Sequence, residues 1–370
     1  MSERKSWGFG PFPRIECGCI NVEILRTMTK SRNVLLISTK SLLEKSLVRS
    51  ITDELGVLEL RSIVVSANPT WNEIKGHIAF LGEWRPQVII GIGGGSVMDT
   101  AKILSISGDN SGIRKLDNQS ALENARRDVS LVLIPTTAGT GAEMTPFATV
   151  WTTSGAGKES VENSEMIPDL VFLDAEFLLE LPFELRLFPA LDTVSHAVET
   201  LWNRYSSPVA VEWAKRSLEI SIEVTPLLLE GTATIQDLQE MMLASSYAGM
   251  AISESHTAIA HSISYPISSK FGVPHGLACS FTIPAICNQF TNNQWSKLRH
   301  PDLVRKGSDM LRKLDLSQFI KEYVSEEDCV GLLPLMNTKS RSDNFIVDAE
   351  DVNLHDVIER SFKPIYNNNK

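Results

Sequence analysis

The sequence has few cysteines and no long apolar run, and each absence excludes a class of protein. Its five cysteines are an odd number among 370 residues, and no two of them form a CxxC pair. This argues against a disulfide framework and against a zinc site built from cysteines. No stretch reaches the roughly 18 consecutive apolar residues that suggest a membrane-spanning helix. The amino-terminal segment lacks the apolar core of a secretory signal peptide, so we expect a cytoplasmic protein.

Positive charge is also scarce. The chain has 35 Lys and Arg residues against 45 Asp and Glu residues, a formal net charge of -10, and the basic residues form no cluster. A nucleic-acid-binding protein neutralises phosphates with clustered Lys and Arg, so we expect no nucleic-acid partner. An acidic protein is not attracted to an anionic membrane surface either. We therefore expect neither nucleic acid nor a membrane as a partner.

Short apolar runs rich in Val and Ile alternate with amphipathic stretches of helical length in the first half of the chain. Continuous apolar runs are typical of strands buried on both faces of a parallel sheet. Their alternation with helices indicates an open α/β sheet. The expected helices include Ser41–Leu55 and Trp71–Trp84. The expected strands are Asn33–Thr39, Arg61–Ser66, Gln87–Ile92, Val129–Pro135 and Asp169–Asp174.

The pattern changes near Pro182, after which long helical periodicities follow and convincing strands disappear. At about 150 residues per domain, a chain of this length is expected to form two domains. We predict an α/β domain over residues 1–180 and an all-helical domain over residues 181–370. The helical patterns of the second half are Asp192–Asn203, Pro208–Leu229, Ile235–Ile252 and His256–Ser269.

A glycine-rich loop follows the third expected strand. The sequence from Arg85 to Lys102 reads RPQVIIGIGGGSVMDTAK. Glycine lets the backbone approach a ligand closely, and the following helix start presents free N–H groups to a pyrophosphate. The alternative is a tight turn without a ligand, but the strand–loop–helix context favours phosphate binding. The candidate cofactor-binding residues are Gly93, Gly94, Gly95 and Ser96.

A second loop, PTTAGTGAE from Pro135 to Glu143, also follows an expected buried strand. Its hydroxyl groups come from Thr136, Thr137 and Thr140, and its glycines Gly139 and Gly141 are expected to allow close approach to a ligand. The alternative is a simple turn rich in Thr and Gly. Two such loops at the carboxyl ends of strands predict an extended dinucleotide cofactor.

The first expected strand ends in the sequence ISTK. Ser38 and Thr39 therefore stand where dinucleotide-binding proteins recognise the ribose of the cofactor. Sites specific for NADH tend to carry Asp or Glu there, which grips the 2′-hydroxyl and repels a 2′-phosphate. Neither residue repels a phosphate, and Lys40 could attract one. We predict that NADPH is accepted, with NADH as the alternative cofactor.

One carboxylate and three imidazoles form a candidate metal site. Asp192 and His196 lie four residues apart in a helical segment, so both side chains project from one face. His261 lies in another helical segment, and His275 follows at a loop or helix start. Taken singly, a histidine is more often an ordinary core or surface residue. The set of four predicts a metal site suited to Fe²⁺ or Zn²⁺.

The sequence resembles the iron-containing (group III) alcohol dehydrogenase family over nearly its whole length. The anchors are GGGSVMD from Gly93 to Asp99, TTAGTGAE, DTVSHAVE, and AHSISYPISSKFGVPHG. The resemblance implies a Rossmann-like first domain and an all-helical second domain, the dehydroquinate synthase-like architecture. It also implies that the two loops bind the cofactor and that the four-residue set binds the metal. Asp99 is implied in the pyrophosphate loop, and Lys158 near the cofactor ribose.

The sequence departs from the family pattern near the expected nicotinamide site. Tyr265 stands where the family often has a second histidine, four residues after a metal ligand. Ala142 replaces a usual serine, and the segment before Asp192 lacks a usual glycine. Tyr265 and His256 are the candidate catalytic residues. The alternatives are a packed aromatic for Tyr265 and a surface position for His256.

The resemblance implies an enzyme that interconverts a small aldehyde and its alcohol, as a homo-oligomer that we expect to be a dimer. The segment containing His261 and His275 resembles phosphonoacetaldehyde reductases, which make 2-hydroxyethylphosphonate. Tyr265, His256, Ser195 and Lys158 are expected to assist an anionic substrate. The alternatives are a neutral aldehyde, glycerol or another polyol, a dehydroquinate synthase-like reaction, or a non-catalytic nucleotide-binding sensor.

Overall fold

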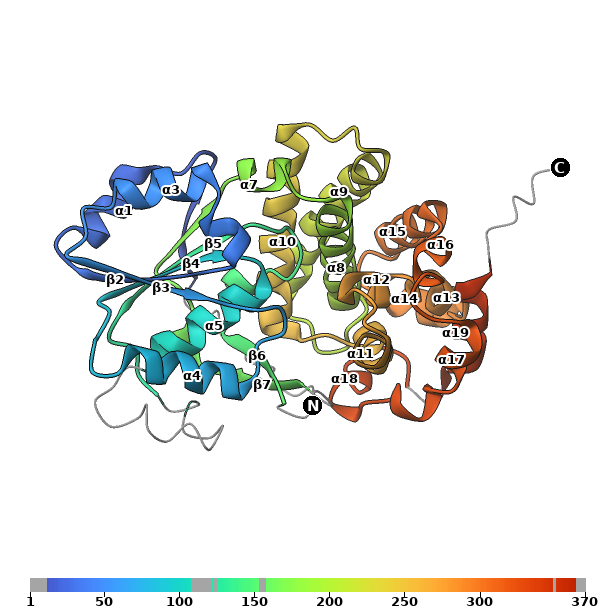
Figure 1. The fold of residues 1–370 in the computed structure, drawn as a ribbon. Helices are drawn as coiled ribbons and strands as arrows, with labels where there is room; N and C mark the ends of the chain where they lie inside the picture. The colour runs from blue at the N-terminus through green and yellow to red at the C-terminus, as the bar shows by residue number, and fades with distance from the viewer. Residues whose placement is uncertain (1–11, 108–121, 123–124, 153–157, 349–350, 364–370) are drawn as a thin grey trace, which may run out of the picture. The chain divides into compact units, whose positions relative to one another are not determined.

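The computed structural model describes residues 12–107, 122, 125–152, 158–348 and 351–363 (Figure 1). The chain forms two compact units. The first comprises the described residues up to Thr136 together with Ala142–Asp174. The second comprises Thr137–Gly141 and the described residues from Ala175 onward. The loop from Pro135 to Glu143 is thus divided between the units. Among the described residues, no helix is long and apolar enough to cross a membrane.

The first unit contains a six-stranded parallel sheet in the order β1-β8-β5-β4-β2-β3. The central strands consist almost wholly of buried residues. This confirms the α/β prediction and the reading of continuous apolar runs as strands covered on both faces. The strands are β1 (Arg14–Cys17), β2 (Asn33–Ser38), β3 (Glu59–Val64), β4 (Val88–Gly93), β5 (Ser130–Pro135) and β8 (Leu170–Leu173).

Helices cover both faces of this sheet. In Figure 1, α1 (Val22–Thr29) and α3 (Ser46–Asp53) lie on one side, and α4 (Trp71–Leu81) and α5 (Gly95–Ile106) on the other. Helix α4 ends at Gly82, whose φ of 57° lies in the left-handed region that favours glycine. Two short 3₁₀ turns, η2 (Ala142–Met144) and η3 (Ser164–Met166), complete the unit.

Three features of this unit were not predicted. Strand β1 is an edge strand with mostly exposed residues, so it has no apolar run to reveal it. Strands β6 (Phe147–Trp151) and β7 (Lys158–Glu162) form an antiparallel pair outside the main sheet. The expected helix Ser41–Leu55 is instead two helices, because Lys45 leaves the helical conformation between α2 (Lys40–Leu43) and α3.

The second unit is helical throughout its described residues, as predicted. Helices α8 (Phe183–Leu201), α9 (Pro208–Glu230) and α10 (Ile235–Ser255) pack against one another. Helix α8 is buried on nearly all sides from Leu187 onward, which is typical of a helix inside a core. It begins nine residues before the predicted start and contains Pro189.

Helices α11 and α12 follow α10 and carry the remaining candidate ligands. Shorter helices complete the unit. They are α7 (Glu176–Leu179), α11 (Ile259–Phe271), α12 (His275–Ser280), α13 (Ile283–Asn288), α14 (Asn292–Lys297), α15 (Pro301–Leu314), α16 (Ser317–Ile320), α17 (Glu326–Val330), η4 (Leu333–Leu335), α18 (Lys339–Ser342) and α19 (Leu354–Phe362).

Candidate metal centre and cofactor loops

Helix α8 directs three ionisable side chains to one face. Asp192, His196 and Glu199 stand at positions i, i+4 and i+7, which coincide on a helix surface. All three side chains are buried. Burying a carboxylate is costly unless it is paired or binds a metal, so this face needs partners from other helices.

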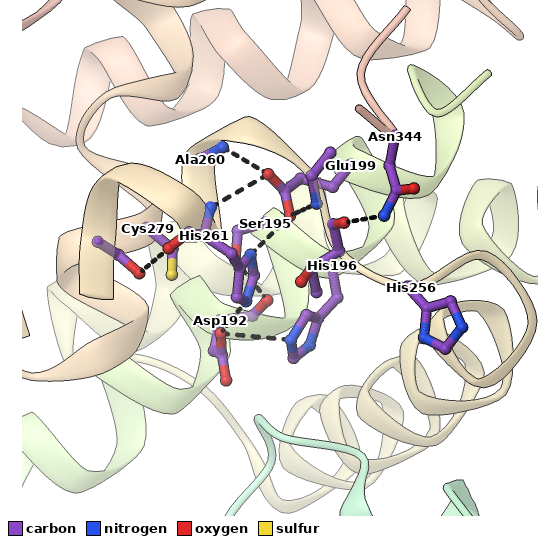
Figure 2. A network of polar contacts seen from close by, with 12 residues as sticks. Asp192, Ser195, His196, Glu199, His256, Ala260, His261, Cys279 and Asn344 are labelled. Carbon is purple, nitrogen blue, oxygen red and sulfur yellow. Dashed lines mark hydrogen bonds and ion pairs between the residues drawn. The ribbon is translucent and has the colours of Figure 1, made fainter. Parts of the chain in front are cut away.

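Those partners are His261 on α11 and His275, the first residue of α12. The Nε2 atoms of His196, His261 and His275 lie 3.6, 3.5 and 4.0 Å from one atom, Oδ1 of Asp192. Figure 2 shows Asp192, His196 and His261 directed toward one another. Four ligands about 2.1 Å from a tetrahedral metal ion would lie roughly 3.4 Å apart. The structure therefore brings all four predicted ligands together at spacings that suit a metal.

Three side-chain atoms of this cluster are buried without a hydrogen-bond partner among the described residues. They are Nδ1 of His196, Oδ1 of Asp192 and Nε2 of His261. Leaving a buried polar atom unsatisfied costs about 1–3 kcal/mol. A divalent cation would satisfy Oδ1 of Asp192 and Nε2 of His261, which lie 3.5 Å apart, and the mixed carboxylate and imidazole set suits iron or zinc. The residues present thus fit the metal that the sequence predicts.

Glu199 is a residue of this centre to which sequence reasoning gave no role. Its Oε2 lies 2.6 Å from Nδ1 of His261. Its two oxygens also accept the backbone N–H groups of Ala258, Ala260 and His261. Because Glu199 contacts Nδ1, the other ring nitrogen of His261, Nε2, faces Asp192. A carboxylate commonly holds a metal-binding histidine in this way, through the ring nitrogen that does not bind the metal. The signal was present, because Glu199 lies seven residues after Asp192 on the same helical face.

The pKa shifts of three cluster residues suit a metal, whereas at His261 a cation would have to replace a proton. Burial acts to lower the pKa of His261, but Cys279 and Glu199 raise it well above its usual range. Burial acts to raise the pKa of Asp192, but the imidazoles of His196 and His275 hold that pKa well below its usual range. Burial lowers the pKa of His196 and so favours its neutral form. Burial also acts to raise the pKa of Glu199, but His261 and the backbone N–H groups lower it overall. Ionised carboxylates and a neutral imidazole are the forms that bind divalent cations.

Tyr265 lies at this centre, one helical turn after His261. Its ring stacks on His275 with a centroid separation of 5.9 Å and an interplanar angle of 7°. Its centroid lies 6.4 Å from that of His261. The side chain of His275 is 30% exposed, so this edge of the cluster is open. The structure therefore places the predicted catalytic tyrosine beside two candidate ligands.

Helix α12 reaches this position because Gly276 follows His275. A Cβ atom at Gly276 would lie 2.6 Å from the backbone nitrogen of Asp192, closer than real Cβ contacts come. The absence of a side chain therefore lets α12 approach α8 closely enough for His275 to join the cluster.

His256 and Ser195 are not brought into the centre. His256 is the exposed C-cap residue of α10, with φ of 57°, and Figure 2 shows its ring apart from Asp192 and His261. Ser195 is fully buried and donates its hydroxyl to the backbone carbonyl of Asp192 at 2.8 Å. Neither side chain offers a donor to a substrate at the cluster. The expectation that they assist an anionic substrate is not supported by their positions.

The glycine-rich loop has the geometry of a phosphate site. Helix α5 begins at Gly95, and its N-cap is Gly94, so no side chain caps the first N–H groups. A Cβ atom at Gly93 would lie 2.5 Å from Cγ2 of Val97, so glycine there also allows the strand and helix to pack. The Ser96 hydroxyl accepts the backbone N–H of Asn68 at 3.1 Å and keeps its own proton to donate. This helix start fits a pyrophosphate.

Of the two other predicted cofactor residues, Asp99 has structural contacts. The Asp99 carboxylate accepts the backbone N–H of Thr149 at 3.0 Å and lies 3.7 Å from Nζ of the buried Lys102. It therefore links α5 to strand β6. Lys158 is the first residue of β7, and its side chain lies outside the described part of the structure.

The threonine loop lies beside the glycine loop. The backbone N–H of Thr136 donates to the carbonyl of Gly93 at 2.9 Å, although the Thr136 side chain is itself buried. Thr137 and Thr140 are partly exposed. These two threonines remain the loop residues with side chains accessible to a ligand.

Gly139 and Gly141 serve a different purpose from the one expected. A Cβ at Gly139 would lie 2.5 Å from Cβ of Pro189, and one at Gly141 would lie 2.5 Å from Cα of Gly249. The Thr193 hydroxyl donates to the carbonyl of Gly139 at 3.2 Å. The close approach that these glycines permit is therefore to helices α8 and α10 rather than to a ligand.

Ser38 and Thr39, the two residues predicted to contact the cofactor ribose, differ in their exposure. Ser38 is fully buried and donates its hydroxyl to the carbonyl of Ile92 at 2.7 Å, across the pairing of β2 and β4. Its side chain is turned into the sheet and is not offered to a cofactor. Thr39 is partly exposed and caps α2 by accepting the backbone N–H of Leu42. Thr39 remains the candidate.

Comparison with known families gives two matches that cover most of the chain. Residues 13–175 match the model described as iron-containing alcohol dehydrogenase. Residues 188–326 match the C-terminal model of the Fe-containing alcohol dehydrogenase family. The boundary between the two matches falls near the boundary between the structural units at Asp174 and Ala175.

Individual relatives have different substrates in their names. The chain is 30% identical over 291 residues to the sulfoacetaldehyde reductase of Bilophila wadsworthia, covering 76% of this chain and 72% of that protein. It is 29% identical over 239 residues to the phosphonoacetaldehyde reductase of Streptomyces viridochromogenes, covering 63% and 60%. The chain spans only 34% to 60% of the length of several curated relatives.

Solved structures share the fold. The sulfoacetaldehyde reductase of Bifidobacterium kashiwanohense, solved in complex with NAD⁺, is similar with a TM-score of 0.81. The match covers 97% of this chain and 98% of that one, at 19% sequence identity. At that identity the likeness shows the fold alone.

Proposed function

Because the chain belongs to the iron-containing alcohol dehydrogenase family, we propose that it is a metal-dependent, NAD(P)-linked enzyme that interconverts a small aldehyde and its alcohol. The observation that carries this proposal is the convergence of three imidazoles on Oδ1 of Asp192, with that oxygen and Nε2 of His261 otherwise unsatisfied. A cluster built only for packing would not leave these atoms without partners.

The metal would be held by Asp192, His196, His261 and His275. When bound, such an ion acts as a Lewis acid that polarises an aldehyde oxygen or lowers the pKa of an alcohol. Glu199 holds the tautomer of His261 that presents Nε2, through its 2.6 Å contact with Nδ1. Tyr265, stacked on His275, would hold a proton at its hydroxyl for the substrate oxygen.

The loops that follow strands β2, β4 and β5 would bind the cofactor. The free N–H groups at the start of α5 orient the pyrophosphate, with Ser96 donating its hydroxyl proton. Thr137, Thr140 and Thr39 would contact the rest of the dinucleotide. When bound, the cofactor would supply the hydride-transfer chemistry, and these residues would bind and orient it.

The test is reconstitution. Purified protein is stripped of metal with a chelator, reloaded with Fe²⁺ or Zn²⁺, and assayed with NADPH or NADH and a panel of short aldehydes. We expect activity to disappear on stripping and to return with metal. The His261→Ala variant should stay folded but lose both bound metal and activity. Undiminished turnover without metal would overturn the proposal, and cofactor binding without any turnover would favour the nucleotide-binding sensor.

We further propose that the aldehyde carries an anionic head group, as phosphonoacetaldehyde does. Two of the relatives are named for phosphonoacetaldehyde and sulfoacetaldehyde, each of which has an anionic group close to the carbonyl. The ring of Tyr265 stacks on His275 beside the ligand cluster, and its hydroxyl would donate to such a head group. A neutral aldehyde or a polyol is the competing substrate class, since another relative is a 1-propanol dehydrogenase.

The proposed domains remain residues 1–180 for the cofactor and 181–370 for the metal. We also propose that the enzyme is a cytoplasmic homodimer. Sedimentation of the purified protein would give its mass, and a single species at the mass of one chain would contradict the dimer.

A further inference from the structure

A buried thiol lies against the proposed metal centre. Cys279 stands on α12, one helical turn after His275, and its side chain is completely buried. Its Sγ lies 3.8 Å from both ring nitrogens of His275. Ligand atoms of Asp192, His261, His275 and Cys279 all lie within 4.8 Å of one another. His196 adjoins this group through its 3.6 Å approach to Asp192.

We propose that Cys279 is a fifth protein ligand of the metal, so that the centre contains a sulfur donor beside the carboxylate and the three imidazoles. The inference rests on the metal-dependent function proposed above and extends it. Its second support is a different observation, because Oδ1 of Asp192 and Nε2 of His261 are buried, have no hydrogen-bond partner and lie 3.5 Å apart. A sulfur atom beside two unsatisfied ligand atoms is placed where a cation would bind.

The chemistry of coordination is simple. The S–H bond breaks, a metal–sulfur bond forms, and the proton leaves to solvent, as is general for thiol ligands. No oxidant or reductant is needed. A thiolate is a softer donor than imidazole or carboxylate, so it would favour zinc or cobalt over manganese or magnesium. The sulfur is fully buried, whereas the side chain of His275 is 30% exposed. The exposed edge therefore remains available to a substrate oxygen.

The ordinary alternative is that Cys279 only fills space, as buried cysteines often do. Cobalt spectroscopy separates the two, because a thiolate bound to Co²⁺ adds a charge-transfer band in the near ultraviolet, apart from the visible d–d bands of the ion. The full-length protein is stripped of metal and titrated with Co²⁺. The variants are Cys279→Ser and Cys279→Ala, and Cys287→Ala is the matched control, since Cys287 is buried on α13 outside the cluster.

We expect wild type and Cys287→Ala to show both sets of bands at one Co²⁺ per chain. Cys279→Ser should lose the charge-transfer band and keep visible bands, with circular dichroism unchanged. Cys279→Ala should show the same absorption bands and the same circular dichroism. Agreement between the two variants would exclude a folding defect caused by one particular substitution. Visible bands without a charge-transfer band in wild type would overturn the sulfur ligand and leave the metal site standing. Absence of stoichiometric binding in wild type would overturn the metal site itself.

Discussion

Glu199 determines which nitrogen of His261 faces the proposed metal. Its carboxylate accepts three backbone N–H groups and contacts Nδ1 of the imidazole, all inside the core. The side-chain amide of glutamine cannot reproduce this pattern. One of its two terminal atoms is an NH₂ donor, which would face the N–H groups that the carboxylate now accepts. The residue is thus a positioning group for a ligand rather than a ligand itself.

We predict that Glu199→Gln weakens metal binding by about 10–100-fold, the usual effect of losing such a partner. The affinity is measured by competition with a coloured chelator. Glu212→Gln is the control, because it removes the same charge from an exposed position on α9. Equal affinity in wild type and Glu199→Gln would show that the carboxylate does not orient His261.

Thr39 is the second residue with a testable role. It is partly exposed at the end of β2, where an acidic side chain would repel a 2′-phosphate. We predict that Thr39→Asp shifts the ratio of kcat/KM for NADPH over NADH toward NADH by about tenfold, or roughly 1.4 kcal/mol. Ser50→Asp, which adds the same charge at an exposed site on α3, should leave the ratio unchanged. A wild-type enzyme that strongly prefers NADH would contradict the argument.

At the level of the elements, the loop between β5 and β6 is fixed by its contacts with helices. Its glycines lie where a Cβ atom would collide with Pro189 on α8 or with the backbone of α10. Helix α8 carries Asp192 and His196, so an error in this packing would be transmitted to the metal ligands.

We predict that Gly139→Ala lowers the free energy of unfolding by about 1–3 kcal/mol, the usual cost of overpacking. Gly76→Ala is the matched control. Gly76 lies within α4, and no atom stands within 4 Å of its added Cβ, so we expect a gain of about 0.5–1 kcal/mol. Urea denaturation of both variants checks the pair. Unchanged stability in Gly139→Ala would mean that the loop can move away from α8.

The elements also show what sequence reasoning can reach. The buried strands and the helices α9 and α10 were predicted within a few residues, because buried elements have a continuous or periodic apolar pattern. Helix α8 begins nine residues before its predicted start. Strand β1 was missed because an exposed edge strand has no such pattern. The four candidate metal ligands were chosen by residue type and spacing, and the structure brings them together. Ser38 and Gly139 were assigned to the cofactor because sequence does not show whether a polar or small residue faces a ligand or a neighbouring element.

At the scale of the whole molecule, the two units contain different parts of the proposed active site. The sheet of the first unit ends in two adjacent loops joined by the bond from Thr136 to Gly93. The helical second unit buries a charged cluster that fits a cation. Neither unit alone contains both the glycine-rich loop and the proposed ligands, so the proposed reaction requires both units.

The last prediction concerns the substrate of that full chain. If the enzyme acts on an anionic aldehyde, kcat/KM for phosphonoacetaldehyde should exceed that for propanal by at least about a hundredfold, because polar groups built for a partner stand unpaired without it. Tyr265→Phe should reduce this preference, since it removes the hydroxyl and keeps the ring that stacks on His275.

Sulfoacetaldehyde belongs in the same assay, because its head group has the same geometry with less charge. A preference shared by both anionic aldehydes would assign the site to anions in general. Tyr265→Phe then shows whether the tyrosine hydroxyl recognises the head group or the reacting oxygen. Loss confined to the anionic aldehydes would indicate the head group, and an equal loss on propanal would indicate proton delivery to the oxygen. Equal efficiency of wild type on all three aldehydes would leave a general alcohol dehydrogenase, with Tyr265 acting as a packed aromatic.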